Sequence, residues 1–455
     1  MGKLFGTDGI RGVVNEGLDA ALAFRAGQAA AIVLGEEKHG RALFLIGKDT
    51  RISSDMLENA LTAGLCSCGA DVLRLGVMPT PAVAYLTVHL KGDAGVVISA
   101  SHNPFEHNGI KIFNGQGFKL SDRLEEKIEE LILSGKPLPV KTRGELGRVR
   151  DGGEKEIRTY IGHLASTLEE EPAGLHLAVD CANGAASRMA RELFSRFPLE
   201  ADFINDEPDG VNINDGCGST HLEGLSRRVK EGGYDLGIAF DGDADRCLVV
   251  DEKGRAVDGD RIMAVCGQAM KKRGRLAGDT IVATVMSNLG FHKFAESAGI
   301  RLECTDVGDR NVLERMLEGG FVLGGEQSGH LIFLEHATTG DGQLAALQFL
   351  SVLCASGKRV SELVSQVPQY PQVLVNVPVS GDREAKSRLM NSPVLRERIL
   401  KEEKALGGDG RILVRPSGTE ALIRVMVEAG ESNTAKKCAE DLAKVIKILD
   451  AGGKC

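Results

Sequence analysis

The sequence lacks the features that mark several large classes of protein. No apolar run reaches the ~18–20 residues that a membrane helix needs, and the opening segment MGKLFGTDGIRG has no apolar core of the kind found in signal peptides. No CxxC pair occurs among the ten cysteines, of which only Cys66 and Cys68 lie close together. We therefore expect a cytoplasmic protein with free thiols and no membrane association, and neither a disulfide framework nor a zinc site.

An excess of positive charge is also missing. The chain carries 55 Lys and Arg residues against 64 Asp and Glu residues, a formal net charge of −9, and only 4% of its residues are aromatic. No stripe of Lys and Arg with interleaved aromatic residues occurs, so we expect no nucleic-acid partner. An anionic substrate is still compatible with this net negative charge, provided that arginines at the binding site attract it more strongly than the rest of the protein repels it.

The length of the chain, 455 residues, is too great for a single core and predicts three or four domains. Polar segments with prolines or charged turns lie at 134–153, 251–260 and 366–373, where domain boundaries are expected. They divide the chain into four blocks, which comprise residues 1–150, 151–255, 256–369 and 370–455.

The first three blocks alternate apolar strands with helices, which is typical of α/β domains with buried sheets. The fourth block has the strand VLVNVPV, one long charged helix, two strands within 411–429 and a C-terminal amphipathic helix. It therefore predicts a smaller α+β domain.

Each of the first three blocks carries an apolar strand that ends in a polar loop rich in glycine or serine. The three segments are VVISASHNP, LGIAFDGDADR and FVLGGEQSGH. Because ligands of open α/β sheets bind beyond the carboxyl ends of strands, three domains could each offer one loop to a shared cleft, which the fourth block would close. Composition alone leaves open the alternative of three unrelated loops.

The DGDADR segment places Asp241, Asp243 and Asp245 directly after an apolar strand. Three carboxylates this close repel one another, and all-oxygen ligation suits Mg²⁺ or Ca²⁺. The bland alternative is a solvated acidic turn. An EF-hand is excluded because Arg246 stands where that loop needs glycine. A phosphatase that uses an aspartyl nucleophile is the stronger rival.

The segment RPSGTEALIR near the C-terminus has the composition of a phosphate-binding loop. Arg415 offers a guanidinium fork, Ser417 and Thr419 offer hydroxyls, Gly418 lets the backbone bend, and Arg424 follows on the next strand. Such groups suit a phosphate dianion, which accepts several hydrogen bonds at once. The alternative is a polar hairpin turn with a surface arginine.

The GEQSGH segment combines a carboxylate, an amide, a hydroxyl and an imidazole at a strand end, in Glu326, Gln327, Ser328 and His330. Ligands rich in hydroxyl groups, such as sugars, need this mixture of donors and acceptors. A glycine turn with a structural histidine is the alternative.

Ser101 follows the buried strand of the first block and is itself followed by His102 and, ten residues on, by Lys111. No GxSxG elbow surrounds this serine, which weakens a hydrolase interpretation. A hydroxyl that carries a phosphoryl group fits better, with Lys111 or His102 moving the proton of a substrate hydroxyl. On its own, Ser101 could equally be a helix N-cap.

Taken together, the motifs resemble the α-D-phosphohexomutase family over nearly the whole chain. The segments FGTDGIRG, ISASHNPFEHNGIKIF, NINDGCGSTH, DGDADR, VGDR, GGEQSGH and RPSGTE follow one another in the order of that family. The resemblance implies four domains around a central cleft: three related α/β domains with mixed sheets and a smaller C-terminal α+β domain.

The resemblance also implies the roles of particular residues. It implies that Ser101 must be phosphorylated for activity and that one Mg²⁺ is held by a phosphoserine oxygen with Asp241, Asp243 and Asp245. Arg11 and Lys111 would lie near the reacting phosphate, with Lys111 as a general acid or base. Arg246, Glu326, Ser328 and His330 would contact the sugar, and the non-reacting phosphate would be bound by Arg415, Ser417, Gly418, Thr419 and Arg424.

The implied activity is that of an intramolecular phosphotransferase of the isomerase class. Gln327, the VGDR segment (307–310) and the GSTH segment (218–221) fit the amino-sugar branch, which interconverts glucosamine 6-phosphate and glucosamine 1-phosphate through a 1,6-bisphosphate. The phosphomannomutase/phosphoglucomutase branch, which usually has GEMSGH, is the alternative.

A metal-dependent sugar phosphatase and a non-catalytic sugar-phosphate binder are more distant alternatives. A homodimer is compatible with the resemblance. Ala244 departs from the glycine found at this position in many members, so we expect the loop backbone to have less freedom.

Overall fold

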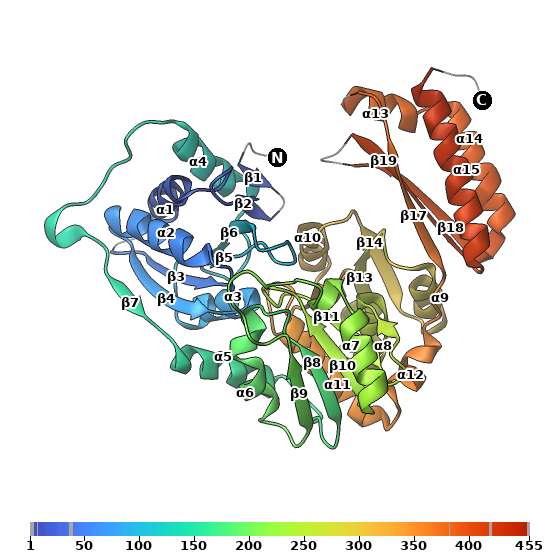
Figure 1. Ribbon diagram of the computed structural model, residues 1–455, viewed down its shortest axis with the longest axis horizontal. Coiled ribbons are helices and arrows are strands. Elements are labelled where there is room, and N and C mark those ends of the chain that lie inside the picture. The colour runs from blue at the N-terminus through green and yellow to red at the C-terminus, as the bar shows by residue number, and fades with distance from the viewer. Residues whose placement is uncertain (1–3, 7, 36–39, 382, 418–420, 453–455) are drawn as a thin grey trace. The chain divides into compact units, whose positions relative to one another are not determined.

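The computed structural model describes residues 4–6, 8–35, 40–381, 383–417 and 421–452. The chain divides into two compact units, the first formed by residues 1–286 and 300–365 and the second by residues 287–299 and 366–455. Within the described residues, three sheets belong to the first unit and one sheet belongs to the second (Figure 1). The α/β class with mixed sheets and a smaller C-terminal α+β domain is as predicted from the sequence.

The first sheet has seven strands in the order β1-β2-β6-β5-β3-β4-β7. Its strands are β1 (Phe5–Gly6), β2 (Gly9–Val13), β3 (Leu43–Lys48), β4 (Asp71–Val77), β5 (Ala94–Ile98), β6 (His107–Asn114) and β7 (Val149–Asp151). Strands β3, β4, β5 and β7 are parallel, whereas β6 and β2 continue the sheet antiparallel. The accompanying helices are α1 (Ala20–Gly35), α2 (Ser54–Ser67), α3 (Thr80–His89) and α4 (Asp122–Leu133).

The second sheet has the order β12-β11-β10-β8-β9. It comprises β8 (His176–Asp180), β9 (Glu200–Ile204), β10 (Leu236–Phe240), β11 (Cys247–Asp251) and β12 (Ala256–Val257). Its helices are α5 (Glu154–Ser166), α6 (Ala190–Phe194) and α7 (Glu223–Gly232).

The third sheet has the order β14-β13-β15-β16. It comprises β13 (Thr280–Thr284), β14 (Arg301–Thr305), β15 (Leu323–Gly325) and β16 (Leu331–Phe333). Its helices are α8 (Gly259–Lys272), α10 (Asp309–Gly319), α11 (Gly342–Ser356) and α12 (Val360–Leu363).

One topological element recurs in all three of these sheets. Strands β5, β10 and β15 each have a parallel neighbour on one side and an antiparallel neighbour on the other, and that antiparallel neighbour is the next strand along the chain. The connecting segments are the serine loop (99–106), the aspartate loop (241–246) and the GEQSGH loop (325–330). The three loops singled out in the sequence therefore occupy equivalent places in three sheets.

The apolar composition of these strands explains why the loops are held firmly. All five residues of β5 (AGVVI) and all five of β10 (LGIAF) are buried. Strands that are covered on both faces consist of continuous apolar runs, so these strands lie inside their domains. The polar residues that follow each strand therefore lie at the edge of the sheet.

The second unit contains a sheet in the order β17-β19-β18, with β17 (Gln372–Pro378), β18 (Gly410–Pro416) and β19 (Leu422–Ala429) all antiparallel. Helix α15 (Ser432–Asp450) packs its apolar residues onto this sheet, and α9 (Leu289–Ser297) belongs to the same unit. The side chain of Glu428 joins α9 to the sheet, because it accepts the Leu289 N–H at 2.9 Å.

The prediction of a single long charged helix in this unit is wrong. The structure has two helices, α13 (Arg383–Met390) and α14 (Pro393–Leu406). Pro393 is the cause, because a proline disfavours helical backbone at the residue before it, and Ser392 is extended with φ −61° and ψ 124°. The proline then begins the second helix, a position where its missing N–H costs nothing.

No helix in the part of the chain that the structure describes is both long and apolar enough to cross a membrane. The nine described cysteines are free, as expected from their scattered positions.

Helices α1 and α2 cross at two glycines that allow their backbones to touch. A Cβ at Gly64 would lie 2.0 Å from the Phe24 carbonyl oxygen, and one at Gly27 would lie 2.3 Å from the Leu61 carbonyl oxygen. Neither contact could be relieved by moving a flexible side chain, since both partners are backbone atoms.

We therefore expect Gly64→Ala to lower the free energy of unfolding by about 1–3 kcal/mol, although alanine favours helix more than glycine does. Gly162→Ala in α5 is the matched control, because no atom outside the local helix lies within 4 Å of its Cβ position. The control should raise stability by about 0.5–1 kcal/mol. Urea unfolding followed by circular dichroism measures both, and equal stabilisation by the two changes would contradict the close crossing.

Candidate active site

Ser101 lies just beyond β5 in a tight turn, with its backbone in the left-handed region at φ 52°. The side chain is buried, and its Oγ donates a hydrogen bond of 2.6 Å to Asp241 Oδ2. His102 Nδ1 lies 3.4 Å from the same Oγ. The backbone after Ser101 forms turns until β6 begins, so the N-cap alternative does not hold.

Arg51 anchors the serine loop through hydrogen bonds to the loop's main-chain carbonyl oxygens. Its guanidinium donates to the carbonyl oxygens of Ser101 and Asn103, each at 2.8 Å, and also to that of Pro104. A non-glycine residue in left-handed backbone is strained by roughly 1–3 kcal/mol. The fork geometry of arginine suits this task, because several donors act from one rigid group.

Asp49 in turn fixes Arg51. It accepts from Arg51 Nε at 2.8 Å and from Ser99 Oγ at 2.6 Å, and both side chains of the ion pair are fully buried. Ser99 Oγ then accepts the N–H of Ser101 at 2.9 Å. The N–H and the carbonyl of Ser101 are therefore both tied to the Asp49–Arg51 pair, which leaves Oγ as the part of the residue that can change partners.

A second segment reaches the serine loop from the neighbouring sheet. Asn214 Nδ2 donates to the Ser101 carbonyl at 2.9 Å and to the Asn103 carbonyl at 3.1 Å. The aspartate loop approaches so closely that a Cβ at Gly242 would lie 2.6 Å from the Ser101 carbonyl oxygen. Glycine is therefore required between the first two aspartates for the two loops to meet.

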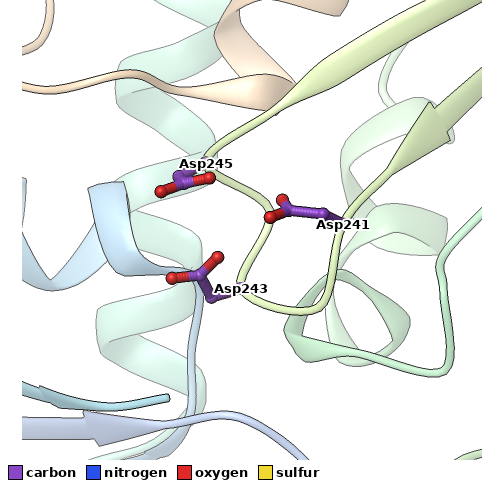
Figure 2. Close-up of side chains that lie close together, drawn as sticks. All are labelled: Asp241, Asp243 and Asp245. Atoms are coloured by element: carbon purple, nitrogen blue, oxygen red, sulfur yellow. The ribbon is translucent and has the colours of Figure 1, made fainter. Parts of the chain in front are cut away.

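The carboxylates of Asp241, Asp243 and Asp245 face one common space (Figure 2). All three residues are buried, and one ligand oxygen from each lies within 4.8 Å of the others. Burial, followed by the charges of Asp245 and Asp243, raises the pKa of Asp241 well above its usual value. Burial also acts to raise the pKa of Asp245, but His330, Lys111 and Arg246 hold it far below its ordinary value.

The hydrogen bonds of the three aspartates suggest a place for a cation. Asp241 accepts from Ser101 through Oδ2 and from the Arg246 N–H through Oδ1. Within the described residues, Asp243 Oδ1 and Asp245 Oδ1 are buried and have no hydrogen-bond partner. Arg246 Nε lies 3.9 Å from Asp245 Oδ1, beyond hydrogen-bond distance. Because a buried carboxylate oxygen that accepts no hydrogen bond is costly, these two oxygens fit a site for a hard cation that prefers oxygen ligands.

Lys111 on β6 is fully buried among acidic groups. Its Nζ lies 2.8 Å from Asp243 Oδ2, 3.0 Å from Asp8 Oδ2 and 3.8 Å from Asp245 Oδ2. Burial alone would lower the pKa of Lys111, but Asp243, Asp8 and Asp245 together raise it. The acidic neighbours of Lys111 therefore favour its charged ammonium form.

His102 has the opposite character. Burial, together with the nearby charges of Arg246 and Arg11, lowers its pKa to about 4. The imidazole is therefore neutral near pH 7 and can accept a proton. The two groups that the sequence offered as proton carriers differ in charge state because their surroundings differ.

Asp8 connects these groups to the third sheet. It accepts from Arg11, from Lys111 and, through Oδ1 at 2.6 Å, from Lys119, and Lys119 also pairs with Asp309. Burial would raise the pKa of Asp8, but the surrounding cations hold it well below its usual value. The network keeps Arg11 beside Lys111.

The GEQSGH loop borders the aspartate loop. His330 Nδ1 lies 3.5 Å from Asp245 Oδ2, while its Nε2 accepts the Gly340 N–H at 3.1 Å. Glu326 Oε1 accepts the Gly308 N–H at 3.2 Å, and Ser328 Oγ donates to Glu326 Oε2 at 3.4 Å.

Gln327 in the same loop has a different kind of partner. Its Nε2 donates to Asp258 Oδ2 at 3.3 Å, and Asp258 is the residue that caps α8. The side chain of Gln327 therefore fixes the loop to the start of a helix.

In the second unit, Arg415 on β18 stands directly opposite Arg424 on β19. Two guanidinium groups at neighbouring positions can donate several hydrogen bonds to one anion, so the pair suits a phosphate. Ser417 follows at the end of β18, where its N–H donates to the Leu422 carbonyl at 2.9 Å. The predicted ligands Gly418 and Thr419 lie outside the described residues.

Comparison with known families covers almost the whole chain. Four parts match the domains of one family: residues 2–138 match phosphoglucomutase/phosphomannomutase alpha/beta/alpha domain I, residues 158–254 match domain II, residues 258–370 match domain III and residues 374–445 match the C-terminal domain. The chain belongs to the phosphoglucomutase/phosphomannomutase family. The resemblance to the α-D-phosphohexomutases inferred from the motifs is thereby confirmed.

Relatives within this family cover nearly full length. The chain is 52% identical to the phosphoglucosamine mutase of Alkaliphilus oremlandii over 98% of this chain and 99% of that protein. It is 53% identical to the phosphoglucosamine mutase of Desulforudis audaxviator over 99% of both. A phosphoglucomutase/phosphomannomutase family protein from Burkholderia thailandensis has the same fold, with a TM-score of 0.82 at 23% identity over 99% of this chain and 98% of that one.

Sequence reasoning missed several residues that hold the mutase-family site together, namely Asp8, Asp49, Arg51, Thr80, Lys119, Asn214 and Asp309. Asp8 and Asp309 lie within the motifs FGTDGIRG and VGDR, although these motifs do not show what the two residues bind. Two further residues left a signal. Asp49 and Arg51 follow the apolar strand β3 in the segment GKDTR, the same strand-end position as the three loops that were singled out. Asn214 lies within the motif NINDGCGSTH, although nothing in the motif shows what it binds.

We expect Arg51→Met to lower the free energy of unfolding by about 3–5 kcal/mol, because it leaves Asp49 charged and buried without its partner. Asp49→Asn in the same background should recover part of this loss. Arg74→Met is the control, since the Arg74–Asp151 pair is partly exposed and should contribute less than about 1 kcal/mol. Chemical denaturation measures all three variants, and an Arg51→Met protein as stable as the control would contradict the anchoring role.

Proposed function

We propose that the chain interconverts glucosamine 6-phosphate and glucosamine 1-phosphate through a phosphorylated Ser101. The observation that carries this proposal is the direct hydrogen bond from Ser101 Oγ to a member of a buried three-aspartate cluster. A hydroxyl beside a cation site is suited to carry a phosphoryl group. The family and the high identity to phosphoglucosamine mutases support the choice of reaction.

Asp241, Asp243, Asp245 and an oxygen of the Ser101 phosphate would hold one Mg²⁺. The Oδ1 atoms of Asp243 and Asp245, which accept no hydrogen bond within the described residues, support this assignment. A magnesium ion bound there would neutralise negative charge on the transferring phosphoryl group. The protein groups supply the rest of the chemistry.

In the first half of the reaction, the C1 hydroxyl of glucosamine 6-phosphate attacks the phosphorus on Ser101. The bond between phosphorus and the C1 oxygen forms as the bond to Ser101 Oγ breaks, which gives the 1,6-bisphosphate. The C1 hydroxyl loses its proton and Ser101 Oγ gains one. These protons would pass through His102, whose Nδ1 lies 3.4 Å from Ser101 Oγ, and Lys111, the two groups predicted to carry them.

In the second half, the bisphosphate turns within the site and Ser101 Oγ attacks its 6-phosphoryl group. The bond between phosphorus and Oγ forms as the bond to the C6 oxygen breaks; Oγ gives up its proton and the C6 oxygen gains one, which returns both proton carriers to their starting states. Glucosamine 1-phosphate is then released and the phosphorylated enzyme is restored. Arg246, Glu326, Ser328 and His330 would contact the sugar, and Arg11 would lie beside the reacting phosphate. The opposed pair Arg415 and Arg424, with Ser417, would bind the phosphate that is not reacting.

A metal-dependent phosphatase is the second candidate, with Asp241 as nucleophile. Both oxygens of Asp241 already accept hydrogen bonds from Ser101 and the Arg246 N–H. The relatives that are 52% and 53% identical to the chain are named phosphoglucosamine mutases, which favours Ser101 over an aspartyl nucleophile as the phosphate carrier. A cytoplasmic location, a homodimer, and the absence of nucleic-acid and membrane partners stay predictions.

Intact-mass spectrometry tests the phosphate carrier. We expect wild-type protein to contain a species heavier by one phosphoryl group, and we expect Ser101→Ala to lose both this species and the mutase activity. Ser134→Ala, at an exposed serine after α4, should keep both. An active Ser101→Ala protein with phosphate on Asp241 would overturn the proposal in favour of the phosphatase.

Substrate choice is tested by comparing kcat/KM for glucosamine 6-phosphate, glucose 6-phosphate and mannose 6-phosphate on the wild-type protein. We expect a clear preference for glucosamine 6-phosphate. Glucose 6-phosphate is the matched control, because it differs from the amino sugar only at carbon 2. A preference for mannose 6-phosphate would instead place the chain with the phosphomannomutases.

A further inference from the structure

Thr80 contacts the central member of the aspartate cluster from a different domain. It is the first residue of α3, it is buried, and it lies 163 positions from Asp243 in the sequence. Its Oγ1 donates a hydrogen bond of 2.6 Å to Asp243 Oδ2, and its N–H donates to the Asp243 carbonyl oxygen at 3.0 Å. One residue therefore fixes both the backbone and the side chain of Asp243.

The hydrogen bonds of Asp243 are strongly asymmetric. Oδ2 accepts from Thr80 Oγ1 and from Lys111 Nζ, whereas Oδ1 is buried and has no partner among the described residues. With two donors on one oxygen, the carboxylate cannot rotate without breaking a bond in a buried place. Asp243 Oδ1 is thereby held facing the space that is shared with Asp241 and Asp245.

Lys111 alone could not supply this constraint. An ammonium group on a flexible stem also approaches Asp8 and Asp245, so it can follow the carboxylate as it turns. Thr80 has a short β-branched side chain whose χ1 is stiff, and its backbone is held by the start of the helix. The hydroxyl therefore has one direction in which it can donate.

From these contacts we infer that Thr80 is a positioning residue for metal binding: it orients Asp243 so that Oδ1 faces the cation. The contact from Thr80 also makes the cation site depend on two domains, because α3 accompanies the first sheet whereas the aspartate loop follows β10 of the second sheet. Groups that orient metal ligands in this way typically change metal affinity by about 10–100-fold when they are removed. The inference rests on the metal site proposed above.

Thr80→Val tests the inference, because valine has nearly the same shape but lacks the hydroxyl. We expect its affinity for Mn²⁺, titrated by electron paramagnetic resonance as a probe of the Mg²⁺ site, to fall by about 10–100-fold. Thr80→Ser keeps the donor and should bind Mn²⁺ close to the wild-type level. Thr87→Val is the matched control, since Thr87 is a buried threonine of the same helix whose hydroxyl donates to the Val83 carbonyl.

A double-mutant cycle shows whether Thr80 acts through Asp243. In an Asp243→Asn background, adding Thr80→Val should change the residual Mn²⁺ affinity by less than about twofold. Full loss of the Thr80→Val effect in this background supports the inference, and an unchanged effect overturns it.

Three other results would count against the inference. Wild-type affinity in Thr80→Val, equal weakening in Thr87→Val, or loss of affinity in Thr80→Ser would each overturn the positioning role. Wild-type protein that binds no Mn²⁺ would instead remove the metal site itself, so the two failures are distinguishable. Should Thr80→Val fail to fold, the comparison of Thr80→Ser with Thr80→Ala decides the question by the same titration.

Discussion

The mutual repulsion of three buried carboxylates is the constraint on which the rest of the site depends. Asp241, Asp243 and Asp245 lie in one short loop away from water, where charges interact strongly. The compensating groups come from all three sheets of the first unit: Lys111 from the first, Arg246 from the second and His330 from the third. Neutralising the loop therefore brings together the groups that proton transfer and sugar binding would use.

The three loops have the same structural origin as well as equivalent positions in their sheets. Each follows a buried strand and turns back into an antiparallel neighbour, which requires a sharp change of direction over a few residues. Two of these turns contain a non-glycine residue in left-handed backbone, Ser101 at φ 52° and Ala244 at φ 54°. Ala244, which stands where many family members have glycine, thus adopts a backbone conformation that glycine occupies at lower cost.

Outside contacts hold both strained residues in place. The Ala244 carbonyl accepts the Gly342 N–H at 3.0 Å from the start of α11, just as the Ser101 carbonyl is held by Arg51 and Asn214. The strain is therefore maintained by neighbouring elements, which is common at sites where a reactive group must be held in one direction.

Much of this arrangement could be predicted from the sequence, because strand ends and motif composition are local properties. The buried strands before Ser101 and Asp241 are continuous apolar runs. The split at Pro393 also follows from a local rule, which the prediction of one long helix overlooked. Thr80 and Arg51 could not be assigned in this way. The role inferred for Thr80 depends on its contact with Asp243, which lies 163 positions away in the sequence. A threonine before a proline usually indicates only the start of a helix.

The way in which Ser101 is held explains how one residue could serve as both acceptor and donor of phosphate. Its N–H is bonded to Ser99 and its carbonyl to Arg51 and Asn214, so the backbone is fixed whatever the side chain carries. Only Oγ would exchange partners, between Asp241 when it is a free hydroxyl and the phosphoryl group in the proposed phosphorylated form. Because the same atoms must work in both directions of a reversible transfer, a geometry set through the main chain is unchanged by the chemistry that it supports.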